Sequence, residues 1–221
     1  MAEANILNAE VRALAALRQL GRKRRAVEFC ELCSCELDPV HPHLIEPLAR
    51  RIACACPACA LLFEGSTTGR YRRIPRDAVW MKDFSIDDIA WEGLSIPIGL
   101  AFFFFSNAAG RMMAIYPSPA GATESLLSLE AWGEVAQQHP LLQRMQPDVE
   151  ALLVDRLSKP HQYYLAPIDR CYELAGMVRK HWRGFTGGEE LWREVEHFFN
   201  RLRGGRPVSN GTGAANAKSS I

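Results

Sequence analysis

Six of the seven cysteines lie in one short stretch of the chain, in two groups whose spacings mirror each other. The groups are C-x2-C-x-C, made by Cys30, Cys33 and Cys35, and C-x-C-x2-C, made by Cys54, Cys56 and Cys59. A C-x2-C turn directs two sulfur atoms at one ion, and two such turns can complete a tetrahedron. Cysteines crowded in this way, in a chain without a recognisable export signal, are more typical of metal ligands than of disulfides. The spacing therefore predicts a metal site.

The simplest ligand set takes the pair from each C-x2-C turn, Cys30 with Cys33 and Cys56 with Cys59. We expect these four thiolates to hold a structural Zn²⁺, whose binding would supply folding energy to a module too small to be stable alone. Iron in a rubredoxin-like site uses the same tetrahedral geometry, so the ligands leave Fe as the alternative cofactor.

Four further side chains could extend this site. Cys35 and Cys54 each lie two residues inward from a predicted ligand, so in an extended segment they would point to the same side as that ligand. They are either small buried residues beside the metal or ligands of a second ion. His41 and His43 could join that ion because alternate strand residues share a face, although histidines in such loops are usually surface residues.

The composition bounds the kind of protein. With 221 residues and 48% hydrophobic residues, the chain can bury a core, and its net charge of +1 gives no overall field that attracts nucleic acid or membranes. The longest apolar run, residues 96–105, is too short to cross a bilayer, which takes about 20 residues. Residues 1–25 lack the continuous apolar segment of a signal peptide. We therefore expect a cytoplasmic protein that binds no membrane.

The elements that must position the cysteines follow from hydrophobic periodicity and turn signals. We expect an α+β protein in four parts: an N-terminal helix (1–27), a Cys-rich module of the zinc-ribbon or rubredoxin type (28–76), an α+β body (77–203) and a disordered tail (204–221). In the module, strands are predicted at 43–46, 51–54, 61–63 and 70–74.

In the body, antiparallel β-hairpins are expected to pack with C-terminal helices. The hairpins are predicted at 100–105 with 112–116 and at 150–155 with 162–166. Helices are predicted at 128–138, at 170–183 and in a third segment whose apolar stripe is Leu191, Val195, Phe198 and Leu202. Asp169 is the expected N-cap of the second helix, and Thr186 and Glu189 form a predicted capping box for the third. Cys171 is expected in the core.

No catalytic residue is predicted, because the chain contains no GxGxxG, P-loop, HExxH or GxSxG motif. Two segments favour protein contact instead, a basic stretch in the module and a helix–Gly-Gly–helix junction that contains tryptophan. The candidate partner-binding residues are Arg70, Arg72, Arg73, Trp182 and Arg183. The basic stretch suits an acidic protein better than nucleic acid, since it contains a single aromatic residue.

Several longer stretches resemble one bacterial family, the domain of unknown function 5947 family. They include CELC, HPHLIE, CACPACALLF, YPSPAGATESLL and PIDRCYELAGMVRKHWRGFTGG, and the resemblance spans about residues 28–203. Members of that family are often encoded beside nickel–iron hydrogenase genes. The resemblance implies a non-enzymatic accessory or assembly factor whose client is a hydrogenase subunit or maturation protein. The family's cysteine pattern matches Cys30, Cys33, Cys54, Cys56 and Cys59, and omits Cys35.

One alternative from a different functional class fits the same cysteines. A rubredoxin-like protein would use iron at this site for electron transfer, or would donate the metal to another protein. The colour of an iron–thiolate centre would distinguish it from a zinc protein.

Overall fold

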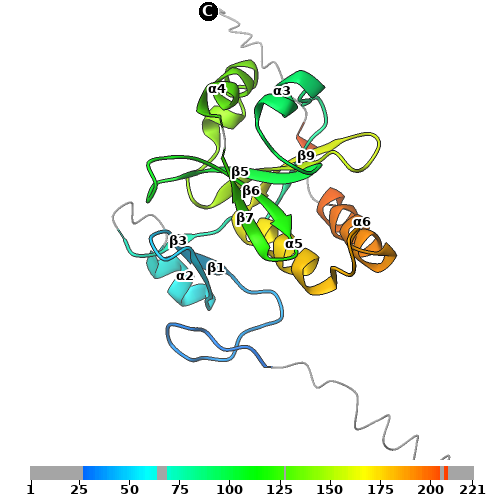
Figure 1. Ribbon diagram of the computed structural model, residues 1–221. Helices are drawn as coiled ribbons and strands as arrows, with labels where there is room; N and C mark the ends of the chain where they lie inside the picture. Colours follow the sequence, from blue (N-terminus) through cyan, green and yellow to red (C-terminus); the bar gives the residue numbers. More distant parts are fainter. Residues whose placement is uncertain (1–26, 64–68, 127, 205–206, 209–221) are drawn as a thin grey trace, which may run out of the picture.

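The chain forms two mainly antiparallel sheets with helices packed against them, so the predicted α+β class is confirmed (Figure 1). The structure is a computed structural model that describes residues 27–63, 69–126, 128–204 and 207–208. The helix predicted within residues 1–27 lies outside this part of the chain, except for its last residue. Among the described residues, no helix is long and apolar enough to span a membrane.

The larger sheet forms the body and has seven strands in the order β10-β4-β9-β8-β5-β6-β7. Its strands are β4 (Val79–Met81), β5 (Leu100–Ser106), β6 (Arg111–Ser118), β7 (Gly121–Ser125), β8 (Glu150–Asp155), β9 (Gln162–Pro167) and β10 (Pro207–Val208). Both predicted hairpins are present, β5 with β6 and β8 with β9. β10 lies in the segment expected to form the tail and pairs parallel with β4, so the sheet extends further along the chain than the sequence indicated.

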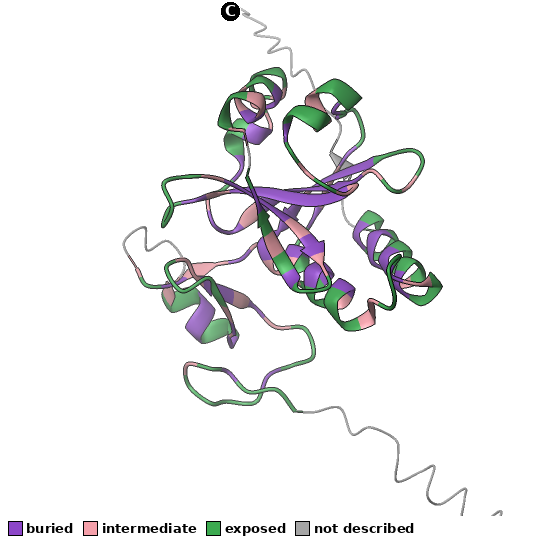
Figure 2. Ribbon diagram, viewed as in Figure 1, coloured by how far each residue is buried: buried purple, intermediate pink, exposed green. Residues whose placement is uncertain are grey.

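Helices cover both faces of this sheet. They are α3 (Asp88–Gly93) and α4 (Leu129–Gln138) on one face, and α5 (Ile168–His181) and α6 (Glu189–Arg203) on the other, with a short 3-10 helix at Leu142–Arg144. Strand β5 is buried on both sides (Figure 2). Phe102 packs against Tyr172 of α5, whereas the next residue, Phe103, stacks on Trp132 of α4. This two-sided burial explains why β5 reads as a continuous apolar run. Cys171, a residue of α5, is fully buried in the core, as predicted.

The smaller sheet belongs to the Cys-rich module and has the strand order β2-β1-β3. β1 (His43–Glu46) and β2 (Arg51–Cys54) have the predicted bounds, and β3 (Arg72–Arg73) is shorter than the predicted strand. The strand predicted at 61–63 is wrong, because these residues end helix α2 (Pro57–Phe63). A proline at the first helical position, followed by alanine and leucine, favours a helix here.

The module packs against the body through both apolar and polar contacts. In β1, Leu44 is buried in the core of the module, whereas Ile45 is buried in the core below α5 and α6. Successive strand residues point to opposite faces, so one strand serves both cores. Arg72 of β3 donates to the Pro147 carbonyl at 2.6 Å and to the Asp148 carboxylate at 3.2 Å.

Two predicted helix caps are wrong. Helix α5 takes Pro167 as its cap residue, and Asp169 lies in the first turn with its carboxylate bonded to His43. Helix α6 takes Gly188 as its cap residue without a side-chain cap bond, so Thr186 does not close a capping box. The Asp169 side chain therefore binds His43 instead of capping α5, and Gly188 takes the cap position of α6 that was predicted for Thr186.

Candidate metal centre

The first cysteine group lies in a tight loop formed by residues 28–37. The Cys30 N–H donates to the Cys35 carbonyl at 2.8 Å, and the Ser34 N–H donates to the Cys30 carbonyl at 2.7 Å. Ser34 has a φ of +61°, a conformation that turns the chain sharply and that glycine adopts most easily. The turn brings Cys35 back beside Cys30 instead of letting the chain extend away.

The second cysteine group spans the end of β2 and the start of α2. Cys56 immediately precedes the helix, and its sulfur accepts a hydrogen bond from the Cys59 N–H at 3.4 Å. The Ala60 N–H donates to the Cys56 carbonyl at 2.9 Å, which begins the helical bonding. The CPAC sequence therefore places the Cys56 sulfur at the start of α2, with Cys59 buried one turn later.

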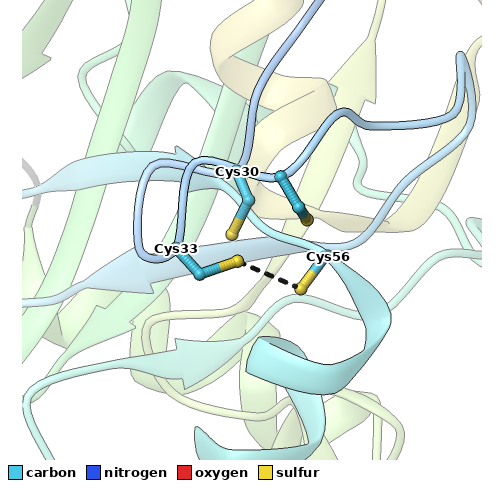
Figure 3. A group of neighbouring side chains, drawn as sticks. Cys30, Cys33 and Cys56 are labelled. Carbon is cyan, nitrogen blue, oxygen red and sulfur yellow. Dashed lines mark hydrogen bonds between the residues drawn. The ribbon is translucent and has the colours of Figure 1, made fainter.

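Four sulfur atoms from these two loops gather in one place. The Sγ atoms of Cys30, Cys33, Cys35 and Cys56 all lie within 4.8 Å of one another, and Figure 3 shows those of Cys30, Cys33 and Cys56 pointing toward one another. The Cys33 and Cys56 sulfurs are 3.7 Å apart. A regular tetrahedron with sulfur about 2.3 Å from zinc has an edge of about 3.8 Å. The residues present therefore fit a tetrahedral metal ion.

The charges of these thiols depend on one another. Burial raises the pKa of Cys30, but backbone N–H groups, led by that of Cys56, outweigh it and bring the pKa to about 6. The Cys59 N–H lowers the pKa of Cys56 in the same way. Contact with the Cys33 sulfur, together with desolvation and nearby negative charge, raises the pKa of Cys35 to about 12. All the thiolates can form together only beside a cation, which a divalent metal ion would supply.

The group of four contains three of the predicted ligands, Cys30, Cys33 and Cys56, with Cys35 in the place expected for Cys59. Cys59 remains close, since its pKa is raised by burial and by contact with the thiols of the other three. Cys59 is therefore a fifth thiol next to the group of four. The spacing does not reveal the turn in the first loop, so one prediction made Cys35 a small buried residue. The Cys35 side chain is in fact exposed.

Glu31 anchors the first loop to strand β2. Its backbone N–H donates to the Cys54 carbonyl at 2.9 Å. Its carboxylate accepts from the Cys54 N–H at 2.8 Å and from the Arg51 guanidinium at 2.7 Å. Sequence reasoning missed this residue, because a glutamate between cysteines reads as an ordinary polar loop residue. Its bonds hold the two cysteine loops next to each other.

The other candidate ligands form a second group. His41, His43 and Cys54 each offer one ligand atom, and these atoms lie within 4.8 Å of one another. His43 and Cys54 are directly opposite in the pairing of β1 with β2, and the His41 ring packs edge-on against that of His43 with centroids 5.0 Å apart. Of the four additional candidates, Cys35 thus joins the first group and the other three lie together.

The arginines proposed for partner binding make contacts within the chain. Arg70 donates to the Glu46 carboxylate at 2.6 Å, and Arg72 bonds to the body as described above. Arg73 lies next to Arg72 in β3 and also has interactions within the chain. These contacts position the arginines, and their role in binding a partner stays a prediction.

The tryptophan junction between α5 and α6 is partly built into the body. Trp182 is half-buried against the main core, and its indole N–H donates to the Gly184 carbonyl at 2.8 Å. Arg183 donates to the Trp182 carbonyl at 2.9 Å. Phe185, in the same junction, is fully exposed. The aromatic residues of this junction therefore divide between the core and the surface.

The fold and the site together define a class: an α+β protein in which a small Cys-rich module carries a thiol cluster that could bind a metal ion. Residues 29–206 match the family model described as "Family of unknown function (DUF5947)". The chain therefore belongs to that family, as its motifs predicted. No curated protein and no solved structure matches the chain.

Proposed function

We propose that the protein is a non-enzymatic accessory factor that binds zinc through the thiols of its Cys-rich module and engages a client protein. The observation that carries the proposal is the set of four Sγ atoms, from Cys30, Cys33, Cys35 and Cys56, within 4.8 Å of one another. One ion at this position would fix both cysteine loops, so the metal would act as part of the fold, as in a zinc ribbon.

The surface of the module supports contact with another protein. Several large apolar side chains of the module are exposed to solvent. Charged residues lie in the same segment of the chain. The exposed apolar residues are Phe29, Val40, Leu48, Leu61 and Leu62. These side chains are available for contact with another protein, and a contiguous patch of them would mark an interaction surface. On the body, Phe185 adds an exposed aromatic group beside Arg183, which suits a contact with a protein partner.

The client that we propose is a nickel–iron hydrogenase subunit or a maturation protein that acts on one. Support for this client comes from family membership, together with the hydrogenase gene neighbourhood that the motif resemblance implies. The proposal places the protein in the cytoplasm, where thiols stay reduced and available to metals.

Affinity purification from cells that make a nickel–iron hydrogenase tests this function. The tagged wild-type chain should recover zinc and a hydrogenase subunit or maturation protein. Replacing both Cys33 and Cys56 by serine should remove the ion of the thiol cluster and the client together. Phe185→Ser should weaken client recovery while the zinc content stays unchanged. Recovery of wild-type protein with zinc but with neither class of hydrogenase protein would contradict the proposed client.

A metal-donor or electron-transfer protein is the second candidate, and Cys59 is the observation that favours it. A fifth thiol in contact with the cluster would be an incoming ligand for a bound ion, and replacement of one thiolate by another is a route for passing the ion to a second protein. Protein purified without oxygen from cells grown with iron would then be red, with the visible absorption of an iron–thiolate centre. Colourless protein that holds zinc and does not pass it to another chelating protein would exclude this candidate.

A further inference from the structure

His41, His43 and Cys54 meet because of how the strands of the module pair. His43 in β1 is directly opposite Cys54 in β2, and residues in that relationship have Cβ atoms about 5 Å apart. His41 lies two residues earlier, so it can share the face of His43. The Ala55 N–H donates to the Pro42 carbonyl at 3.0 Å, which continues the pairing beyond the strand end.

Hydrogen bonds fix the orientation of both imidazole rings. His41 Nδ1 lies 2.8 Å from the backbone carbonyl oxygen of Asp38, and His43 Nδ1 lies 2.6 Å from a carboxylate oxygen of Asp169. These oxygens accept hydrogen bonds, so each Nδ1 is the donor and each neutral ring keeps a lone pair on Nε2. Metal-binding histidines are held in this way, with a carboxylate or carbonyl on the nitrogen remote from the ion.

One of these lone pairs is buried without a partner. The His41 side chain is 6% exposed, and its Nε2 has no hydrogen bond to any of the described residues. Buried polar atoms are normally paired, and an unpaired one costs about 1–3 kcal/mol. An ion bound to Nε2 would satisfy this atom.

We propose that His41, His43 and Cys54 form a second metal site, with three protein ligands and one open coordination position. Two imidazoles and one thiolate suit a divalent ion of intermediate softness, such as Zn²⁺ or Co²⁺. Water or another small ligand completes the tetrahedron, as in zinc sites that have three protein ligands. An ion held in this way exchanges its fourth ligand, unlike an ion enclosed by four thiolates.

The charges around the site favour a cation. A Glu28 carboxylate oxygen lies 3.7 Å from His41 Nδ1, and the Asp169 carboxylate is bonded to the other ring. Burial raises the pKa of Cys54, and the negative charges of Glu28 and Glu31 raise it further. The thiol therefore gives up its proton most readily when a positive ion is present.

The second site differs from the thiol cluster in its ligands and in its supports. None of its three ligands belongs to the group of four sulfurs. The carboxylate that orients His43 comes from helix α5 of the body, whereas the thiol cluster is built from the module alone. All of these contacts lie within the chain, so the second site does not require a role in hydrogenase assembly.

Titration of the metal-free full-length chain with Zn²⁺, followed by native mass spectrometry, tests the second site. The wild type should bind two ions, and His41→Ala and His43→Ala should each bind one. Asp169→Asn, which keeps the size of the side chain, should weaken the second ion by about 10- to 100-fold. His197→Ala is the matched control: this exposed histidine of α6 is in neither group, so the variant should still bind two ions.

X-ray absorption of the wild type provides a check that does not require any variant to fold. The zinc-saturated protein should show nitrogen at about 2.0–2.1 Å in addition to sulfur at about 2.3 Å. A shell of sulfur alone would overturn the proposal. An affinity for the second ion that is the same in Asp169→Asn as in the wild type would remove the proposed role of that carboxylate and count against the site.

Discussion

The Asp169 carboxylate lies 2.6 Å from Nδ1 of His43, although 126 residues separate the two in the sequence. His43 begins strand β1 of the Cys-rich module, and Asp169 lies in the first turn of helix α5 in the body. A carboxylate is favoured in the first turn of a helix by the helix dipole, and Asp169 has that position in α5. The bond therefore connects the metal-binding part of the chain to the part that has the larger core.

Removing the metal should loosen the module and leave the body folded. The cysteine loops are held by few apolar contacts, whereas the larger sheet is buried on both faces. With a strong chelator present, hydrogen exchange measured by mass spectrometry should accelerate in residues 28–63. It should stay unchanged in β5 and β8. Equal protection of the module with and without chelator would show that no ion holds the loops.

Cys35 and Cys59 should partly replace each other as the fourth thiol ligand. Cys35→Ser and Cys59→Ser should each keep one ion at the thiol cluster with reduced affinity, and the double variant should bind it more weakly than either single variant, because only three thiols then remain. Competition with a chromogenic chelator measures this in the His41→Ala background, where the second site is removed.

Cys171→Ala is the control for the thiol series. Its sulfur is fully buried in the body and lies in neither ligand group, so the metal affinity should equal that of the parent protein. If Cys35→Ser alone abolished binding while Cys59→Ser had no effect, the two thiols would not be interchangeable, and the cluster would use Cys35 alone.

Ser34→Gly should stabilise the metal-bound module. Ser34 has a φ of +61°, where a side chain causes strain that glycine avoids. Glycine removes this strain but also gives the unfolded chain more conformational freedom. The net gain in stability should be about 0.5–1 kcal/mol, or about two- to fivefold in zinc affinity. Ser34→Ala keeps the Cβ atom and should show no gain. A gain of the same size in both variants would attribute the effect to the lost hydroxyl.

Asp148→Ala should destabilise the whole protein. The Asp148 side chain is buried and accepts bonds from the Asn107 backbone N–H at 2.9 Å, from the Asn107 side-chain amide at 2.6 Å and from Arg72 at 3.2 Å. Alanine would leave these donors unpaired, at a cost of about 2–4 kcal/mol. Urea unfolding measures the loss. Asp148→Asn, which still accepts hydrogen bonds, should lose less, and a larger loss in asparagine than in alanine would disprove this explanation.

Acidification should destabilise the body through His139. Burial against Phe84 lowers the pKa of His139 below its usual value of 6.5. As the pH falls, His139 is therefore protonated in the unfolded chain before it is protonated in the folded chain. The free energy of unfolding should therefore fall as the pH drops below about 6.5. His139→Phe removes this titration, so its stability should decline less between pH 7.5 and 5.5. Chelator in every sample keeps metal release from contributing.

Much of the fold followed from local patterns. The predicted bounds of β1 and β2 are confirmed. They were predictable because two short apolar segments flank a turn that begins at Pro47. Helix α2 was missed because a short apolar run reads equally well as a strand or as a buried helix segment. The proline at position 57, the first residue of that helix, was the available signal.

The candidate site was predictable in its composition more than in its connections. The cysteine spacing indicated a thiol cluster, but the position of Cys35 in the group of four sulfurs depends on the turn at Ser34, which spacing does not encode. Asp169 could be read only as a helix cap, because its partner, His43, is remote in sequence. Long-range contacts of this kind arise from the packing of the module on the body.

Successive side chains of strand β1 face two different cores. Its odd positions, His43 and Ile45, face α5 and the large core, and Leu44 between them faces the core that contains Cys30, Cys56 and Cys59. Inserting or deleting a single residue between His43 and Ile45 would turn one of these two side chains away from the body. This segment can therefore vary by substitution, but a change of its length by one residue would disconnect the two halves of the molecule.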